Sequence, residues 1–403
     1  MKYIFNTLRK NKTSTTLKNM DSFLRDMDYE NEKLKHASES LKVLGDTYKE
    51  LENIRSDTKI NRGRDAAVSQ LYDMSEVFGE YSKEAHKKIE IPKKKYTYLM
   101  NVLHKRNIYA ENINFIKKRK KYYEITMDVK LQKNVCITSK ELADIISRTF
   151  GKKFVPDDAS RRVINKELNR YIFIEETPYK AVCGVARCGK DKSEISGDNF
   201  SVCTPDNIRT VMCLCDGMGS GKRANFESEI MVELLERFLE AGFMEVTAIK
   251  MINLAYATEN YKGNPVTMDV SVIDKYSGNM KMIKMGAAPT FIKRADTSKI
   301  EIISSTSLPA GVFEVPDIEE YSIQLNDGDM IIMISDGILD AISSDNKEEY
   351  LEGMISAMNI KNPKIFAEKL LSGVICDDNS IKDDMTIIVT GIWSKSCKNL
   401  ILV

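Results

Sequence analysis

The sequence predicts an α+β fold in which antiparallel sheets, stacked as a sandwich and flanked by helices, follow a helical and mixed region. Tight turns such as Tyr276–Asn279 and Asn326–Asp329 separate many short apolar runs in the second half of the chain. The runs that we expect to be strands are 180–188, 200–204, 209–215, 266–273, 280–286, 321–325, 330–335 and 385–392. Helical stretches at 223–240, 244–260 and 363–372 lie between them. With 403 residues, 42% of them hydrophobic, the chain can bury a large core and form two or three domains.

The chain divides into four predicted parts. Residues 1–106 are a helical, coiled-coil-like regulatory segment, because apolar residues recur in heptads over 14–60. This helix could pack on its own chain or pair with a second copy, and the sequence leaves both open. A second helix follows over 71–85, and a shorter one begins after Pro92.

Residues 107–175 form a small α+β regulatory subdomain and linker in this prediction, with a strand at 122–130. A helix over 138–147 begins with a capping box of Thr138 and Glu141. The sandwich domain occupies 176–395, and a tail follows at 396–403.

Charge is uneven along the chain, although the formal net charge is only +1. Residues 1–150 carry +10 and residues 151–403 carry −9. The most basic run, Lys117–Lys121, could contact nucleic acid or anionic lipid, but a solvated strand edge or hairpin explains it better. We therefore expect no nucleic-acid partner.

Several classes of protein are disfavoured by what the sequence lacks. The eight cysteines form no Cys-x-x-Cys pair, so reduced thiols explain them better than disulfides or zinc. The chain shows no signal peptide and no apolar run near the roughly 20 residues of a membrane span, so we expect a cytoplasmic protein. All three histidines, His36, His86 and His104, lie in the first third. A serine triad, a Cys-His pair or a histidine-bearing zinc site in the second half would need one of them.

Acidic residues gather at the ends of predicted strands. An apolar run over 211–215 leads into Asp216 and a turn with glycines at 217, 219 and 221, and a second run leads into Asp336-Gly337. Asp198 and the pair Asp383-Asp384 instead precede strands. In an antiparallel sheet both kinds of position can meet at one edge. Such a cluster suits hard cations such as Mg²⁺ or Mn²⁺, two of which can activate water and neutralise a phosphoryl group.

These residues resemble a known family. The phrase Asp216–Ala224 is similar to the phosphatase segment of the stage II sporulation protein E family, bacterial members of the PP2C-like metal-dependent serine/threonine phosphatases. Supporting phrases occur in the family's order, and the resemblance covers about 180–393. They are Ser196–Asp198, Thr267–Asp269, Lys284–Thr290, Ser307–Gly311, Ser335–Gly337 and Asp383–Thr386.

The resemblance implies a PP2C-like sandwich with two Mn²⁺ or Mg²⁺ ions. By resemblance, Asp216 bridges both ions, the Gly217 carbonyl binds one, and Asp198, Asp336 and the Asp383-Asp384 pair supply the other ligands. The family commonly has Asp-Asn at the last position, which favours Asp383 without excluding Asp384. Asp216 and Asp198 would act in catalysis through metal-activated water that attacks phosphoserine directly.

The resemblance also implies partners. The expected substrate is a phosphorylated anti-anti-sigma factor, whose dephosphorylation activates a sporulation sigma factor. Apart from the resemblance, a homodimer could form through helices 14–60 or 223–240. The family's membrane-spanning segment is absent from this chain, so a membrane location at the division site would require a longer form.

Rival hypotheses remain beside this one. A P-loop fails on spacing, because three residues rather than four separate Gly217 from Gly221-Lys222. A GHKL-type kinase fails on the register of its glycines, and a non-catalytic or inhibited phosphatase-like sensor or scaffold is the main alternative. Asp327 and Asp329 are predicted to form a hairpin turn. Asp269, with Thr267 and Ser271 on the same strand face, is expected to support the site.

Overall fold

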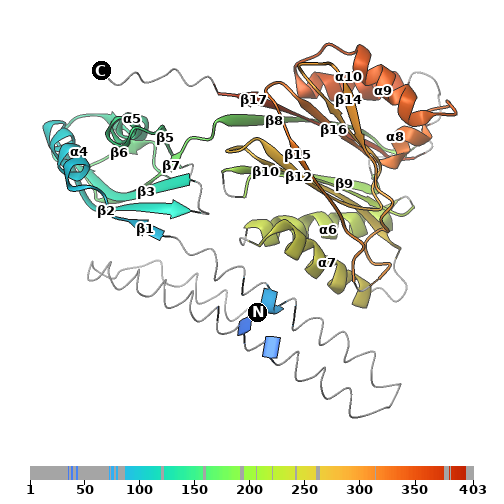
Figure 1. Cartoon of the computed structure of the whole chain (residues 1–403), viewed down its shortest axis with the longest axis horizontal. Helices are drawn as coiled ribbons and strands as arrows, with labels where there is room; N and C mark the ends of the chain where they lie inside the picture. The colour runs from blue at the N-terminus through green and yellow to red at the C-terminus, as the bar shows by residue number, and fades with distance from the viewer. Residues whose placement is uncertain are drawn as a thin grey trace. The chain divides into compact units, whose positions relative to one another are not determined.

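We analysed a computed structural model of the chain. It describes residues 87–395 except 119–121, 158–159, 191–194, 206, 220, 241–242, 260–263, 314, 376–380 and 382, together with isolated positions at 35, 38, 39, 42, 43, 72, 74–76 and 79. The chain separates into two compact units, Met1–Glu176 and Thr177–Val403. Each is described by itself, with the element labels of Figure 1.

The first unit contains a five-stranded antiparallel sheet in the order β1-β2-β3-β7-β5. Its strands are β1 (Lys87–Ile89), β2 (Ile108–Lys118), β3 (Tyr122–Leu131), β7 (Asn169–Glu175) and β5 (Phe154–Pro156). Two short strands, β4 (Ile137–Thr138) and β6 (Val163–Ile164), form a separate antiparallel pair. Helices α4 (Lys93–Lys105) and α5 (Ser139–Phe150) share one apolar core with this sheet.

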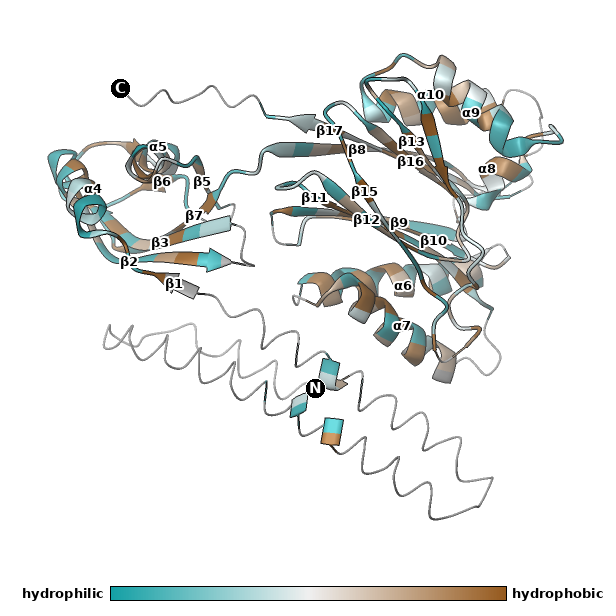
Figure 2. Ribbon diagram, viewed as in Figure 1, coloured by the Kyte–Doolittle hydropathy of each residue, from teal (hydrophilic) through white to brown (hydrophobic). Residues whose placement is uncertain are grey.

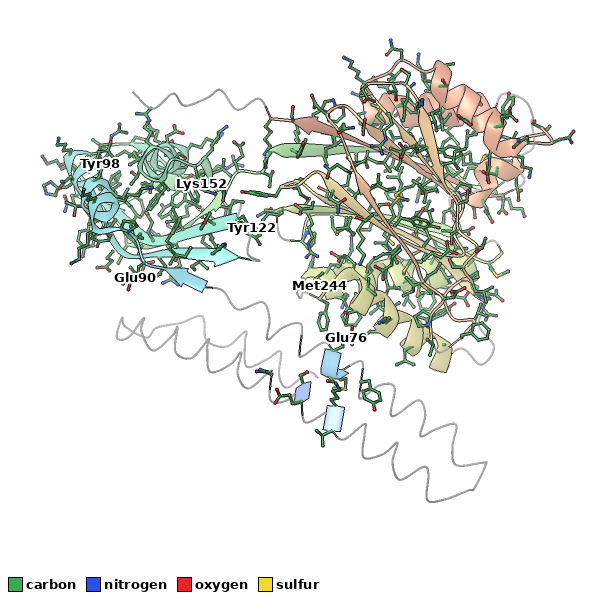
Figure 3. The ribbon with its side chains drawn as sticks, in the orientation of Figure 1. Glu76, Glu90, Tyr98, Tyr122, Lys152 and Met244 are labelled. Atoms are coloured by element: carbon green, nitrogen blue, oxygen red, sulfur yellow. The ribbon has the colours of Figure 1, made fainter. Side chains whose placement is uncertain are left out.

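Local signals in this unit behave as predicted. Thr138 caps α5, accepting a hydrogen bond from Glu141 N, and the Glu141 side chain accepts from Thr138 N, so the capping box is confirmed. Lys117 and Lys118 end β2 and pair with the start of β3, which agrees with the hairpin interpretation of the basic run. Lys152, labelled in Figure 3, pairs with Glu175 at 2.6 Å and lies over the Tyr123 ring.

Most of the predicted heptad helix lies outside the described residues. The described positions between 35 and 43 are helical, as are those between 72 and 79. Ser38 and Ser75 exchange hydrogen bonds, because each hydroxyl donates to the other residue's carbonyl, at 2.6 and 2.8 Å. Two helical segments therefore pack closely through small side chains at this point.

The second unit is a sandwich of two five-stranded sheets in which every pairing is antiparallel, so the predicted fold class is confirmed (Figure 1). The first sheet has the order β15-β12-β11-β10-β9. These strands are β15 (Glu319–Gln324), β12 (Asn279–Met285), β11 (Val266–Asp274), β10 (Arg209–Gly217) and β9 (Asp198–Cys203). Helices α6 (Lys222–Glu240) and α7 (Glu245–Glu259) cover its outer face.

The second sheet has the order β14-β13-β16-β17-β8. These strands are β14 (Ile300–Ile303), β13 (Thr290–Lys293), β16 (Met330–Ile334), β17 (Met385–Ser394) and β8 (Tyr179–Cys188). Helices α8 (Asp336–Asp340), α9 (Lys347–Ala357) and α10 (Pro363–Ile375) share a core with its outer face.

Three apolar layers hold the sandwich together. Alternate residues of each strand face opposite ways, so Cys213 and Cys215 of β10 pack under α6 and α7, whereas Met212 and Leu214 face the other sheet. The all-apolar β16 contributes to both faces of its sheet, and Figure 2 shows hydrophobic residues along the central strands. Burial on both faces explains why these strands read as continuous apolar runs.

Some local predictions were wrong or incomplete. The turn Asn326–Asp329 is not a hairpin turn, because β15 before it and β16 after it belong to different sheets. Its acids still stabilise the turn: Asp329 accepts from Asn326 N and Asp327 accepts from Ser394 N. In the second unit the sequence analysis missed β13, β14, α8 and α9, and in the first unit it predicted only β3 among the strands. Among the described residues, no helix is long and apolar enough to cross a membrane.

Candidate functional site

Two of the predicted acids face each other on neighbouring strands of the first sheet. Asp216 lies near the end of β10 and Asp198 begins β9, and the antiparallel register pairs them directly. Like charges directly opposite each other destabilise a sheet. The strand pairing therefore holds two carboxylates together at an energetic cost, which is typical of a functional position rather than a structural one.

The second sheet brings two more acids to the same place. Asp336 is the first residue of α8, immediately after β16, and Asp383 precedes β17, which pairs with β16. Gly337 permits this approach, because a Cβ there would collide with the Asp384 carbonyl. Besides burial, the negative charges of Asp198, Asp336 and Asp383 raise the pKa of Asp216. The four acids therefore lie close enough to repel one another.

Burial adds to this mutual repulsion. Loss of hydration is the largest cause of the raised pKa of Asp216, followed by the charge of Asp198. Burial also raises the pKa of Asp198, an effect that the Thr386 and Ser335 hydroxyls oppose, and burial raises the pKa of Asp383. A divalent cation would reverse this balance by favouring the ionised carboxylates.

Asp198 provides the sharpest test of whether a metal ion fits. Its side chain is only 1% exposed, yet neither carboxylate oxygen has a hydrogen-bond partner among the described residues. The Thr386 hydroxyl, which is buried nearby, is also without a partner there. An unpaired buried carboxylate is unfavourable unless a cation binds it. The donor set, made entirely of oxygen atoms, is the one that Mg²⁺ and Mn²⁺ prefer.

The acids are gathered but are not set at coordination distance. Within the part of the chain that the structure describes, no three Asp, Glu, His or Cys side chains converge closely enough to hold an ion. Binding an ion would therefore require these side chains to draw together.

Asp383 and Asp384 have different environments. The two carboxylate oxygens of Asp384 accept hydrogen bonds from Lys190 N at 2.8 Å and from Gly197 N at 2.6 Å. Asp384 is thus occupied in joining the loop before β9 to the loop before β17, and it is 4% exposed. Asp383 accepts a local hydrogen bond from Asp384 N at 2.9 Å and is partly exposed. The geometry favours Asp383 as the residue free to bind a ligand.

Helix α6 fixes the strand ends that carry Asp198 and Asp216. Gly217 donates its N–H to the Gly197 carbonyl at 3.2 Å, and a Cβ on Gly217 would collide with the Ala224 carbonyl of α6. Ser228 donates to the Gly197 carbonyl at 2.5 Å, and Asn225 donates to the Ser196 carbonyl at 2.7 Å. The sequence analysis missed Asn225 and Ser228, because helical periodicity alone does not show which strand a polar side chain will reach.

A cavity lies between the two sheets beside these acids. Its walls include Asp216 and Thr267 from the first sheet, Asp336 from the second, and the loop 286–288. Thr267 accepts a hydrogen bond from Asp216 N at 3.3 Å. Asp269, expected from the sequence to support the site, also lines this cavity.

The chain is similar to known proteins over most of its length. The sequence signature of the family described as Stage II sporulation protein E matches residues 206–392. Stage II sporulation protein E of Bacillus subtilis (strain 168) is 27% identical over 336 residues, which cover 83% of this chain and 40% of that protein. Its counterpart from Priestia megaterium is 27% identical over 396 residues, covering 95% of this chain and 65% of that protein. The chain thus spans less than two thirds of either relative.

A solved structure is similar over most of the chain. It contains the PP2C phosphatase domain and a fragment of the regulatory domain of the cell fate determinant SpoIIE from Bacillus subtilis. The sequences are 26% identical, the match covers 84% of this chain and 98% of that one, and the TM-score is 0.60.

Proposed function

We propose that this chain, whose second unit resembles the PP2C-type protein serine/threonine phosphatase domain of the stage II sporulation protein E family, hydrolyses phosphoserine in a protein substrate with two Mn²⁺ or Mg²⁺ ions. The observation that carries this proposal is Asp198, a buried carboxylate without a partner, opposite Asp216. Hydrolysis of a phosphate ester requires neutralisation of the negative charge on the phosphoryl group. Asp198 and Asp216 would bind the cations that provide this neutralisation.

Asp198, Asp216, the Gly217 carbonyl, Asp336 and Asp383 would hold the ions. Such ions polarise a phosphoryl oxygen and lower the pKa of water near them. The charges of acids from both sheets raise the pKa of Asp216, so Asp216 lies near all of them. This position would allow its carboxylate to contribute to binding of both ions. Asp384 would keep the loops carrying Asp198 and Asp383 in place through its two backbone hydrogen bonds.

The protein's own groups must then manage the proton transfers. The second unit contains no histidine, since all three lie at or before position 104. Carboxylates and water therefore take the place of imidazole in any acid-base step. Burial is the largest influence on Asp198 and raises its pKa, so a bound cation would be needed to keep this carboxylate ionised near neutral pH.

The physiological substrate that we propose is a phosphorylated anti-anti-sigma factor, so that its dephosphorylation activates a sporulation sigma factor. The family of the two curated relatives supports this choice. We further propose that two copies associate through helix α6 or through the segment 14–60, which light scattering would test.

Phosphate release from a phosphoserine protein tests the proposal directly. The full chain would be assayed with EDTA and with Mn²⁺, beside Asp216→Ala with its fold checked by circular dichroism. We expect release that depends on Mn²⁺ and is lost in the variant. A folded protein that binds Mn²⁺ but releases no phosphate from any phosphoserine protein would instead support the alternative, a non-catalytic or switch-inhibited sensor.

A further inference from the structure

A buried ion pair lies beside the cavity described above. Lys284 Nζ contacts Asp269 Oδ2 at 2.6 Å, and the two side chains are 0% and 1% exposed. Lys284 also donates to the Ala288 carbonyl at 2.7 Å, and Thr290 donates to the same Asp269 oxygen at 2.8 Å. One oxygen of Asp269 thus has two donors. The other, Oδ1, has no partner among the described residues.

Stability alone is a poor explanation for this pair. The cost of removing two charges from water often exceeds their attraction, and apolar replacements of buried pairs are frequently neutral or stabilising. The pair does, however, join two walls of the cavity. Asp269 belongs to β11, whereas Ala288 belongs to the loop that faces it, and both line the cavity with Asp216 and Asp336. The pair therefore fixes the shape of the space next to the acids.

The register shows how far Asp269 lies from the acids. Asp216 pairs with Thr267, so Asp269 is its diagonal neighbour two residues along β11. Diagonal neighbours in an antiparallel sheet are about 7–8 Å apart. This separation is too long for direct contact between short side chains and leaves room for one water molecule that accepts and donates hydrogen bonds.

We propose that Asp269 and Lys284 are a positioning pair for the phosphatase site. Lys284 and Thr290 hold Asp269 Oδ2, so that Oδ1 remains a hydrogen-bond acceptor for a water molecule in the cavity beside Asp216 and Asp336. This inference rests on the proposed function, because the ordered water serves hydrolysis at those acids. Asp269 acts through that water and does not itself contact the phosphate.

The test is a double-mutant cycle on the full chain. Asp269→Asn and Lys284→Met each leave one buried charge unpaired, whereas the double variant Asp269→Asn/Lys284→Met is again electroneutral. The matched control is Arg209→Met/Glu245→Gln, because Arg209 and Glu245 form another buried ion pair of this unit, between β10 and α7, and do not line the cavity. For each variant, the unfolding midpoint and the Mn²⁺ affinity are measured by calorimetry. The values of kcat and KM are measured by phosphate release.

We expect the double variant to recover the unfolding midpoint lost in the single variants but not the activity. Its kcat should fall about 10–100-fold, the usual effect of losing a partner that orients a metal site, with KM nearly unchanged and weaker Mn²⁺ binding. The control double variant should keep kcat. Recovery of both stability and kcat in the cavity double variant would show that the pair is merely structural and would overturn the proposal.

Two further results keep the outcomes separable. If the double variant does not fold, Thr290→Val removes one hydrogen bond to Asp269 and should still lower kcat several-fold; unchanged kcat and Mn²⁺ affinity there would also overturn the proposal. If the unaltered chain shows no Mn²⁺-dependent activity, the proposed function fails, and the Mn²⁺ affinities of the same variants still decide whether the pair organises the site.

Discussion

Replacing Asp198 by asparagine should make the metal-free protein more stable and the metal-bound protein less active. The substitution keeps the size of the side chain and removes its charge. Burial is the main cause that raises the pKa of Asp198 from 3.8 to about 7. The folded state therefore holds this proton more tightly than the unfolded state, and stability falls as the pH rises from about 4 to about 7.

The magnitude follows from the size of the shift. At about 1.4 kcal/mol per pKa unit, the buried carboxylate costs about 1–2 kcal/mol at pH 5 and roughly 4 kcal/mol at pH 8. The buried amide of asparagine, if it finds no partner, costs about 1–3 kcal/mol at either pH. The net gain is then near zero at pH 5 and about 1–3 kcal/mol at pH 8. For a domain of this size, the gain at pH 8 corresponds to a rise of about 2–12 °C in Tm.

Differential scanning calorimetry in EDTA at pH 5 and pH 8 measures this gain, and repeating it with Mn²⁺ measures metal binding. We expect Mn²⁺ to raise the Tm of the unaltered protein by more than that of Asp198→Asn, since a ligand stabilises only the state that binds it. A variant that is less stable than the parent at pH 8 in EDTA, or whose gain is the same at both pH values, would refute the argument from burial.

Three other substitutions test neighbouring features. Asp384→Ala should lower the free energy of unfolding by about 2–4 kcal/mol, because it removes two hydrogen bonds to a carboxylate. Asp383→Ala should leave urea-induced unfolding nearly unchanged and abolish Mn²⁺-dependent phosphate release. If Asp383→Ala instead lowered stability and Asp384→Ala abolished phosphate release, Asp384 would be the metal ligand and Asp383 the structural residue. Gly337→Ala should cost at least about 1–3 kcal/mol, because its Cβ would meet the Asp384 carbonyl. Gly353→Ala, in open space on α9, is the matched control and should add about 0.5–1 kcal/mol.

Local chemistry accounts for what the sequence could predict. The capping box at Thr138 and the apolar run that ends at Asp216 depend on residues close together in sequence, and both appear in the structure where expected. Strands β13 and β14 have four residues each, too few to show a period, and the polar start of α9 hid its apolar face.

Long-range contacts account for what the sequence could not predict. Asp384 lies next to Asp383 and has the same chemistry, but its partners, Lys190 N and Gly197 N, come from the loop before β9, almost two hundred residues earlier in the chain. Likewise, the lysine of the phrase Lys284–Thr290 could be quoted as a motif, but only the pairing of β11 with β12 brings it to Asp269.

The order of strands in the second sheet has a consequence for synthesis of the protein. β8, the first strand of the sandwich to leave the ribosome, pairs along ten residues with β17, the last, and β17 is also the neighbour of β16. Asp383 enters the site only when β17 has been inserted between these two strands. A nascent chain that is still growing thus carries Asp198, Asp216 and Asp336 without the sheet that completes them. If the proposed phosphatase activity depends on Asp383, that activity would require β17 to have been synthesised and inserted between β8 and β16.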